Sequence, residues 1–316
     1  MCNQNCNYEK CFEFDFIKND KGIKAPKFTE KNLALITTFL KYNSSYSNAE
    51  NREKGSYSYI LEEQTDDFFN CLGKQPQKYD SSMQDTSKRE KTVRNKDYDA
   101  LDYKKDTLYL VIEDIDRINS THLASEGTKK DKEKADETKK NKGRANTAEK
   151  LRKITNLREL LQKSDTDLVN KIAGFGSKNK YNFSFATKFC AYVCRHALAM
   201  ENYCIYDEVV QSILPFYIKA YVDDTEMYKK YYQIVNPKKE DKRYVKSTVY
   251  KLKDRKNETG YKEYKNIIDE IIKGIEKKDG IVVNYEQFDH MLWYYFKGSK
   301  TKVQKAMNVL PDIKFD

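Results

Sequence analysis

The sequence lacks the signatures of the common nucleotide-dependent and hydrolytic enzymes. Its 316 residues contain no P-loop, no G-x-S-x-G nucleophile elbow, no HExxH zinc motif and no Rossmann G-x-G-x-x-G fingerprint. Glycine and proline are scarce, at 11 and five residues, and there is one tryptophan. We therefore expect no small-molecule cofactor, and the function has to be inferred from other side chains.

Long apolar runs are also missing. No stretch approaches the roughly 20 residues that span a bilayer, and the first residues, MCNQNCNYEKCFEF, lack the apolar core of a secretory signal. The seven cysteines are an odd number. We expect a soluble, reduced, intracellular protein, cytoplasmic or nucleoid-associated, with no membrane partner.

A metal site is not expected either. Cys2, Cys6 and Cys11 are spaced by four and five residues, which is a poor zinc-knuckle pattern, and none of the three histidines is close to them in sequence.

Positive charge and aromatic residues are abundant. Charged residues make up 34% of the chain, the formal net charge is +10, and there are 25 tyrosines and 15 phenylalanines. A basic balance suits a polyanion such as DNA, and surplus aromatic rings suit stacking on bases. The alternatives are a lysine-rich composition without a partner and aromatic rings that fill a core.

The apolar spacing predicts a mainly α-helical protein. A helix is expected from Phe28 with Thr29 as its cap, and another over 57–72 with Gly73 closing it. Residues 107–118, TLYLVIEDIDRI, fit a buried helix or a strand. Further helices are expected near 149–163, 165–173, 184–199, 207–221, 225–233, 261–278, 284–296 and 300–308.

Three regions follow from these patterns. Residues 1–118 are interpreted as a mostly helical N-terminal region after an irregular lead-in, and 149–316 as a helical domain. Between them, residues 119–148 contain almost nothing that could be buried. This charged linker or insertion is expected to be disordered or a lone solvated helix.

A glycine-containing turn joins two of the expected helices. Ile172 and Ala173 are followed by Gly174-Phe175-Gly176-Ser177-Lys178. The glycines permit positive φ and expose backbone N–H groups that suit a phosphate. Gly174, Gly176, Ser177, Lys178 and Lys180 are therefore candidate DNA-binding residues. The alternative is an ordinary connection between helices.

Lys188 is placed in the first turn of the expected helix 184–199, for which Ser184 is a plausible N-cap. The apolar neighbours Phe183, Phe185 and Phe189 and the positive end of the helix both disfavour an ammonium ion, which favours a nucleophilic amine. The alternative is a lysine that extends to solvent.

Asp207 is an excellent N-cap for the next helix, and this alone explains its presence. A helix from Lys188 to Ala199 rises roughly 16–18 Å, and an extended segment 200–206 returns at most about 23 Å. Asp207 can therefore lie beside Lys188, with both near the N-terminal ends of helices.

This order of hairpin, lysine helix, extended return and aspartate resembles the helix-hairpin-helix DNA glycosylases, in particular the 8-oxoguanine glycosylase branch. The resemblance is closest over residues 168–214, where Lys188 and Asp207 keep the family's 19-residue interval and Cys194, Ala197 and Leu198 match similar family residues. It implies a multi-helix glycosylase-like fold, with Lys188 attacking C1′ to form a Schiff base and Asp207 assisting loss of the base.

The resemblance leaves alternatives open. Ten residues separate Lys178, which matches the family's hairpin, from Lys188, which matches the interval to Asp207, so Lys178 is the rival nucleophile. Cys204-Ile205-Tyr206 replaces the family's small residue-Pro-Val, and no N-terminal β domain is evident.

The expected function is a DNA glycosylase with lyase activity that removes a damaged or modified base. The alternative is a non-catalytic DNA-binding or interaction module on the same fold. A flipped base would need a pocket, for which Phe185, Tyr203 and Tyr206 are the candidates. Phe183 and Trp293-Tyr294-Tyr295 come next, and core packing is the alternative for all of them.

Overall fold

The computed structural model describes residues 14–18, 24–42, 56–74, 106–119, 123, 137–175, 181–222 and 260–296. Over these residues the protein is mainly helical, as the sequence predicts, and its strands are limited to a short antiparallel pair. No described helix combines the length and the apolar character needed to cross a membrane.

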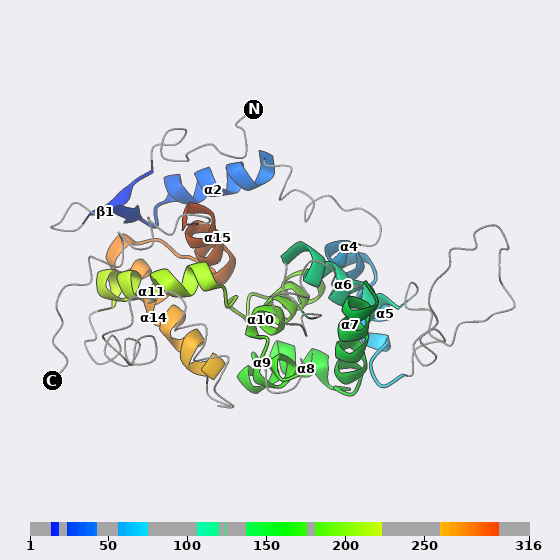
Figure 1. The fold of residues 1–316 in the computed structure, drawn as a ribbon. Helices are drawn as coiled ribbons and strands as arrows, with labels where there is room; N and C mark the ends of the chain where they lie inside the picture. Colours follow the sequence, from blue (N-terminus) through cyan, green and yellow to red (C-terminus); the bar gives the residue numbers. More distant parts are fainter. Residues whose placement is uncertain are drawn as a thin grey trace, which may run out of the picture.

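The elements form two groups that lie side by side in Figure 1. The first, here called the α4–α10 group, contains α4 (Tyr57–Glu63), α5 (Thr65–Asn70), α6 (Thr107–Asn119), α7 (Glu137–Arg152), α8 (Leu157–Gln162), α9 (Thr166–Ala173), α10 (Phe183–Tyr192) and the π-helical turn η4 (Val193–Ala197). The second, the α11–α15 group, contains β1 (Phe16–Lys18), β2 (Lys24–Pro26), α2 (Glu30–Tyr42), α11 (Glu208–Tyr221), α14 (Gly260–Asp279) and α15 (Tyr285–Phe296). In chain order, the described elements thus run from β1, β2 and α2 of the second group through the first group and back to the second.

Helix α6 decides the open question about residues 107–118 in favour of a helix. Leu108, Val111, Ile112 and Ile115 recur at helical spacing and are fully buried. The predicted cap of α2 is also present, because Thr29 Oγ1 accepts a hydrogen bond from the Asn32 amide.

The prediction that residues 119–148 are an unburied linker is wrong for the part that forms α7. This helix packs against α6, and Ala145 and Ala148 are buried. Arg144 is buried as well, and it bonds Asp116 at 3.0 Å and Glu113 at 2.8 Å. The two buried alanines are three residues apart in a lysine-rich segment, so their apolar pattern is weak in the sequence. The buried arginine is tolerated because two carboxylates of α6 pair with it.

Two expected helices are interrupted. The helix over 57–72 is divided at Gln64 into α4 and α5, although Gly73 closes it with φ +75° as expected. The helix over 149–163 is the end of α7, a turn, and α8. The helices expected at 225–233 and 300–308 lie outside the described residues.

The N-terminal segment belongs to the α11–α15 group. Phe28 stacks on Phe288 with ring centroids 5.4 Å apart, and the Tyr217 hydroxyl donates to the Pro26 carbonyl at 2.7 Å. The irregular lead-in that the sequence predicted therefore includes the β1–β2 pair.

Helices α11 and α14 approach closely at Gly274. A Cβ there would meet the Tyr221 carbonyl group, 2.9 Å from its carbon atom. The contact requires glycine, and it fixes α11, whose N-terminal end carries Asp207.

Candidate active site

The N-cap of the lysine helix α10 lies two residues earlier than predicted. Asn182 is its N-cap and accepts a hydrogen bond from the Phe185 amide at 3.0 Å, so the predicted cap, Ser184, lies inside the helix. Lys188 consequently lies in the second turn instead of the first. Its Nζ donates to Ser184 Oγ at 3.3 Å, an i to i−4 contact along the same face.

The chain turns back after α10 through an irregular helix end. The π-helical turn η4 extends α10, and Ala199 adopts a left-handed φ of +51°. The Met200 amide then bonds the Cys194 carbonyl at 3.0 Å, which closes the helix end. The predicted extended return follows, because residues 200–206 contain no helix.

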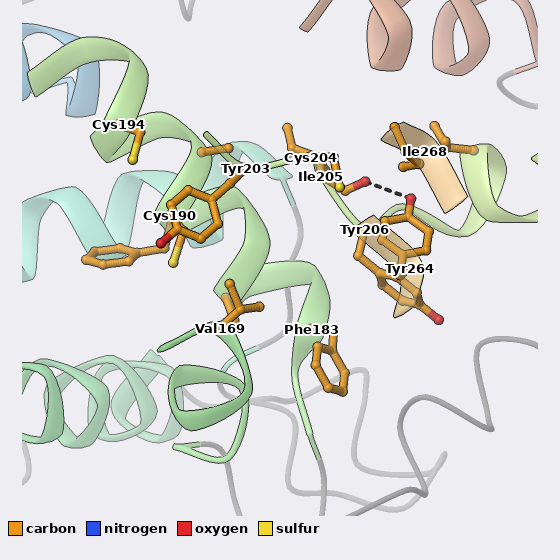
Figure 2. Close-up of a cluster of buried hydrophobic side chains, with 14 of the residues drawn as sticks. Val169, Phe183, Cys190, Cys194, Tyr203, Cys204, Ile205, Tyr206, Tyr264 and Ile268 are labelled. Carbon is orange, nitrogen blue, oxygen red and sulfur yellow. Dashed lines mark hydrogen bonds between the residues drawn. The ribbon is translucent and has the colours of Figure 1, made fainter. Parts of the chain in front are cut away.

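Thr187, the residue before Lys188, fixes the returning segment beside the lysine. Thr187 Oγ1 is fully buried, donates to the Phe183 carbonyl at 2.7 Å and accepts from the Tyr206 amide at 3.0 Å. Tyr264 of α14 holds the same segment by donating to the Ile205 carbonyl at 2.9 Å, the contact drawn in Figure 2. These two hydrogen bonds fix the position of Asp207, which directly follows the segment.

Lys188 and Asp207 form an ion pair, as the reach calculation allowed. Lys188 Nζ lies 3.9 Å from Asp207 Oδ2, and the exposed fractions of the two side chains are 10% and 17%. Asp207 is also the N-cap of α11, and its Oδ1 accepts from the Val209 amide at 2.8 Å. One carboxylate thus serves both as the N-cap of a helix and as the ion-pair partner of a lysine.

A second carboxyl group, Asp289 of α15, belongs to the same cluster, and sequence analysis missed it. Its Oδ1 is buried without a hydrogen-bond partner among the described residues. Burial and, after it, the charge of Asp207 raise the pKa of Asp289, Lys188 and Arg195 oppose the rise, and the result is a pKa of about 7. The sequence feature that could have indicated Asp289 is an acidic residue directly after Phe288, a buried residue of an aromatic-rich helix.

Arg195 of η4 connects the two groups of elements at this point. It bonds Glu201 Oε1 at 2.5 Å and Glu286 Oε1 of α15 at 3.1 Å. Burial alone would lower the pKa of Arg195, but the hydrogen bond to Glu201 and the two acidic charges outweigh it and raise the pKa. The pKa of the neighbouring His290 is lowered to about 4 by burial and by Arg195, so that ring is neutral at pH 7.

The glycine-containing turn is only partly within the described residues. Gly174 has a helical φ of −74° and is the C-cap of α9, so this position does not use the positive φ that glycine permits. An added Cβ would make only ordinary contacts of 3.5 Å. Gly176, Ser177, Lys178 and Lys180 lie outside the described residues. Their proposed DNA contacts and the rival role of Lys178 as nucleophile therefore stay predictions.

The three candidate pocket residues are core residues. The exposed fractions of Phe185, Tyr203 and Tyr206 are 1%, 1% and 3%, and Figure 2 shows Tyr203 and Tyr206 among other buried side chains. The Tyr203 hydroxyl bonds the Leu160 and Asp165 carbonyls at 3.2 Å each. None of these rings has an open face for a base, which agrees with the packing alternative.

The comparisons with known proteins add a domain family but no activity. A family model described as HI_0787_N, an N-terminal domain, matches residues 90–197, less than half of the chain. The match ends with η4, so it includes Lys188 and Arg195 but not Asp207 or Asp289. No curated protein and no solved structure matches the chain. Among the described residues, no cluster of His, Cys, Asp and Glu could hold a metal ion.

Proposed function

We propose that this protein is a DNA glycosylase with lyase activity, which removes a damaged or modified base through a Schiff base at Lys188. The observation that carries the proposal is the 3.9 Å approach of Lys188 Nζ to Asp207 Oδ2, with both side chains mostly enclosed. The proposal also rests on the 19-residue interval that resembles the glycosylases. The net charge of +10 suits a DNA partner, and the protein would act where DNA is found, in the cytoplasm or on the nucleoid.

The chemistry assigns different tasks to the two residues. A neutral Lys188 amine attacks C1′ of the flipped nucleotide, and the glycosidic bond breaks as the base leaves. Asp207 is held in place by the hydrogen bond that its Oδ1 accepts from the Val209 amide at the N-terminal end of α11. Its carboxylate then faces the positive charge that develops on the sugar, which is stabilising in an enclosed site.

Borohydride trapping tests the nucleophile. A duplex that contains an abasic site is the primary probe, because an abasic aldehyde forms a Schiff base without recognition of a particular base. Duplexes with damaged or modified bases follow. We expect covalent trapping by the wild type and none by Lys188→Gln. Lys219→Gln, an exposed lysine of α11, is the matched control.

The outcomes separate the candidate nucleophiles. Full trapping by Lys188→Gln refutes the role of Lys188. Loss of trapping in Lys178→Gln alone transfers the role to Lys178.

A second candidate function is DNA binding without catalysis. It is favoured by the burial of Lys188 and by its hydrogen bond to Ser184, since these contacts also describe a structural ion pair. Fluorescence anisotropy with a labelled duplex at increasing salt concentrations tests it. Salt-dependent binding together with no trapping and no released base on any duplex would establish this alternative.

A further inference from the structure

The segment 204–206 lies directly before the aspartate of the proposed site, and α14 holds its backbone with two tyrosine hydroxyls. Tyr264 donates to the Ile205 carbonyl at 2.9 Å. Tyr261 donates to the Cys204 carbonyl at 3.0 Å. Both tyrosines and all three residues of the segment are buried, so a lost hydrogen bond is not replaced by bulk water. The path of the chain before the aspartate therefore depends on α14 as well as on α10.

Tyr264 has a second contact with this segment. Its ring meets the Tyr206 ring edge to face, with centroids 5.1 Å apart, and Figure 2 shows Tyr264 beside Ile205 and Tyr206. The Tyr206 hydroxyl in turn accepts a hydrogen bond from Gln211 Nε2 at 2.5 Å, near the start of α11. Tyr264 thus contacts both residues that directly precede Asp207, and through one of them the helix that Asp207 caps.

The approach of Asp207 to Lys188 leaves little room for displacement. Asp207 Oδ2 lies 3.9 Å from Lys188 Nζ, close to the limit of about 4 Å for an ion pair. Lys188 belongs to α10, whereas the segment before Asp207 is also held by α14. Loss of the α14 contact therefore moves the carboxylate relative to the amine. A misplacement of about 1 Å in a catalytic site can cost about 10²-fold in rate.

We propose that Tyr264 is a positioning residue, whose hydroxyl sets the distance between Asp207 and Lys188. The proposal rests on the proposed function, because that function assigns the carboxylate its charge-stabilising task. The hydroxyl acts indirectly: it holds the Ile205 carbonyl, and the segment then places Asp207 opposite the charge that develops on the sugar. Helix α14 lies outside residues 90–197, so the domain that the family model matches does not supply this support.

The experiment is a double-mutant cycle on the rate constant of borohydride trapping, with the abasic duplex as probe and the protein in excess. It compares wild type, Tyr264→Phe, Asp207→Asn and the double variant. We expect Tyr264→Phe to trap about ten-fold more slowly than wild type, within the range that a small misplacement causes. In the Asp207→Asn background the same change should have no further effect, because the hydroxyl acts through that carboxylate.

Two measurements separate positioning from a loss of folded protein. The amplitude of trapping with the duplex in excess counts the active molecules, and we expect it to be unchanged in Tyr264→Phe. Tyr217→Phe is the matched control, because it also removes a buried tyrosine hydroxyl from a backbone carbonyl, that of Pro26, towards the C-terminal end of α11. Its rate constant should equal that of the wild type. Tyr261→Phe, which acts one residue further from Asp207, should have an intermediate effect.

The failures of the two proposals are distinguishable. Trapping by Tyr264→Phe at the wild-type rate, or an equal slowing in Tyr217→Phe, refutes the role of Tyr264. A reduced amplitude with an unchanged rate constant shows a structural role only and also overturns the proposal. An equal slowing by Tyr264→Phe in the wild-type and Asp207→Asn backgrounds shows an effect that bypasses Asp207, and the positioning role fails. If the wild type traps no duplex, the proposed function itself fails and Tyr264 loses its role with it.

Discussion

Ionisation of Asp289 should destabilise the folded protein, and Asp289→Asn removes that ionisation. The pKa of Asp289 rises from an ordinary 3.8 to about 7, first by burial and then by the charge of Asp207. The folded state therefore binds the proton more tightly than the unfolded state. Below about pH 4 the group is protonated in both states and contributes nothing. Stability falls as the pH rises from 4 to 7, and the full penalty applies above 7.

The magnitude follows from the size of the rise in pKa. A rise of about three pKa units corresponds to roughly 4 kcal/mol at 1.36 kcal/mol per unit. This is an upper value, because the residue as a whole is half-buried and solvent reduces the penalty. We expect the free energy of unfolding of Asp289→Asn, relative to wild type, to increase by about 2 kcal/mol between pH 4.5 and pH 8. Comparing two pH values cancels any change in packing caused by the amide.

Urea unfolding at the two pH values measures this difference. The tryptophan fluorescence of Trp293, the one tryptophan in the chain and a residue of α15, reports on the same helix. Asp207→Asn should reduce the wild-type pH dependence, because the charge of Asp207 contributes to the raised pKa of Asp289. Identical pH dependence in wild type and Asp289→Asn would refute the assignment of a raised pKa to Asp289.

Three further substitutions test the supports of the site. Gly274→Ala places a Cβ against the Tyr221 carbonyl group and should lower the free energy of unfolding by about 1–3 kcal/mol in urea titrations. Ala199→Gly relieves a left-handed φ at an exposed residue and should raise the urea midpoint, with a gain of about 1 kcal/mol. Thr187→Val leaves the buried Tyr206 amide without its acceptor. It should cost about 1–3 kcal/mol and slow borohydride trapping by more than the loss of folded protein explains.

The parts of the fold that the sequence predicted are those with a strong local signal. The apolar residues of α6 recur on one face. Asp207 is an acidic residue directly before an apolar helix, which is the usual pattern of an N-cap. The approach of Lys188 to Asp207 could be predicted because only 19 residues separate them and the intervening helix has a known rise. Local periodicity and a short reach were sufficient for this pair.

The parts that could not be predicted depend on distant residues. The burial of α7 was not predicted because it depends on Arg144 pairing with Asp116 and Glu113 of α6, which no local pattern indicates. The pocket role of Tyr203 and Tyr206 was inferred from residue type, but tertiary packing encloses both rings. Aromatic residues in a basic protein suit either a core or a base, and only the packing distinguishes the two.

The site shows the same division between local and distant information. Lys188 and Asp207 are close in sequence, whereas Asp289 is 82 residues beyond Asp207 and reaches the pair through the packing of α15 on α11. The residues matched by the family model end at 197, so they include the amine and neither carboxyl group. A complete site of this composition therefore requires the α4–α10 group to supply the amine and the α11–α15 group to supply both acids. The contact of Arg195 with Glu286, which joins the two groups at 3.1 Å, consequently helps to hold the two parts of the proposed site together.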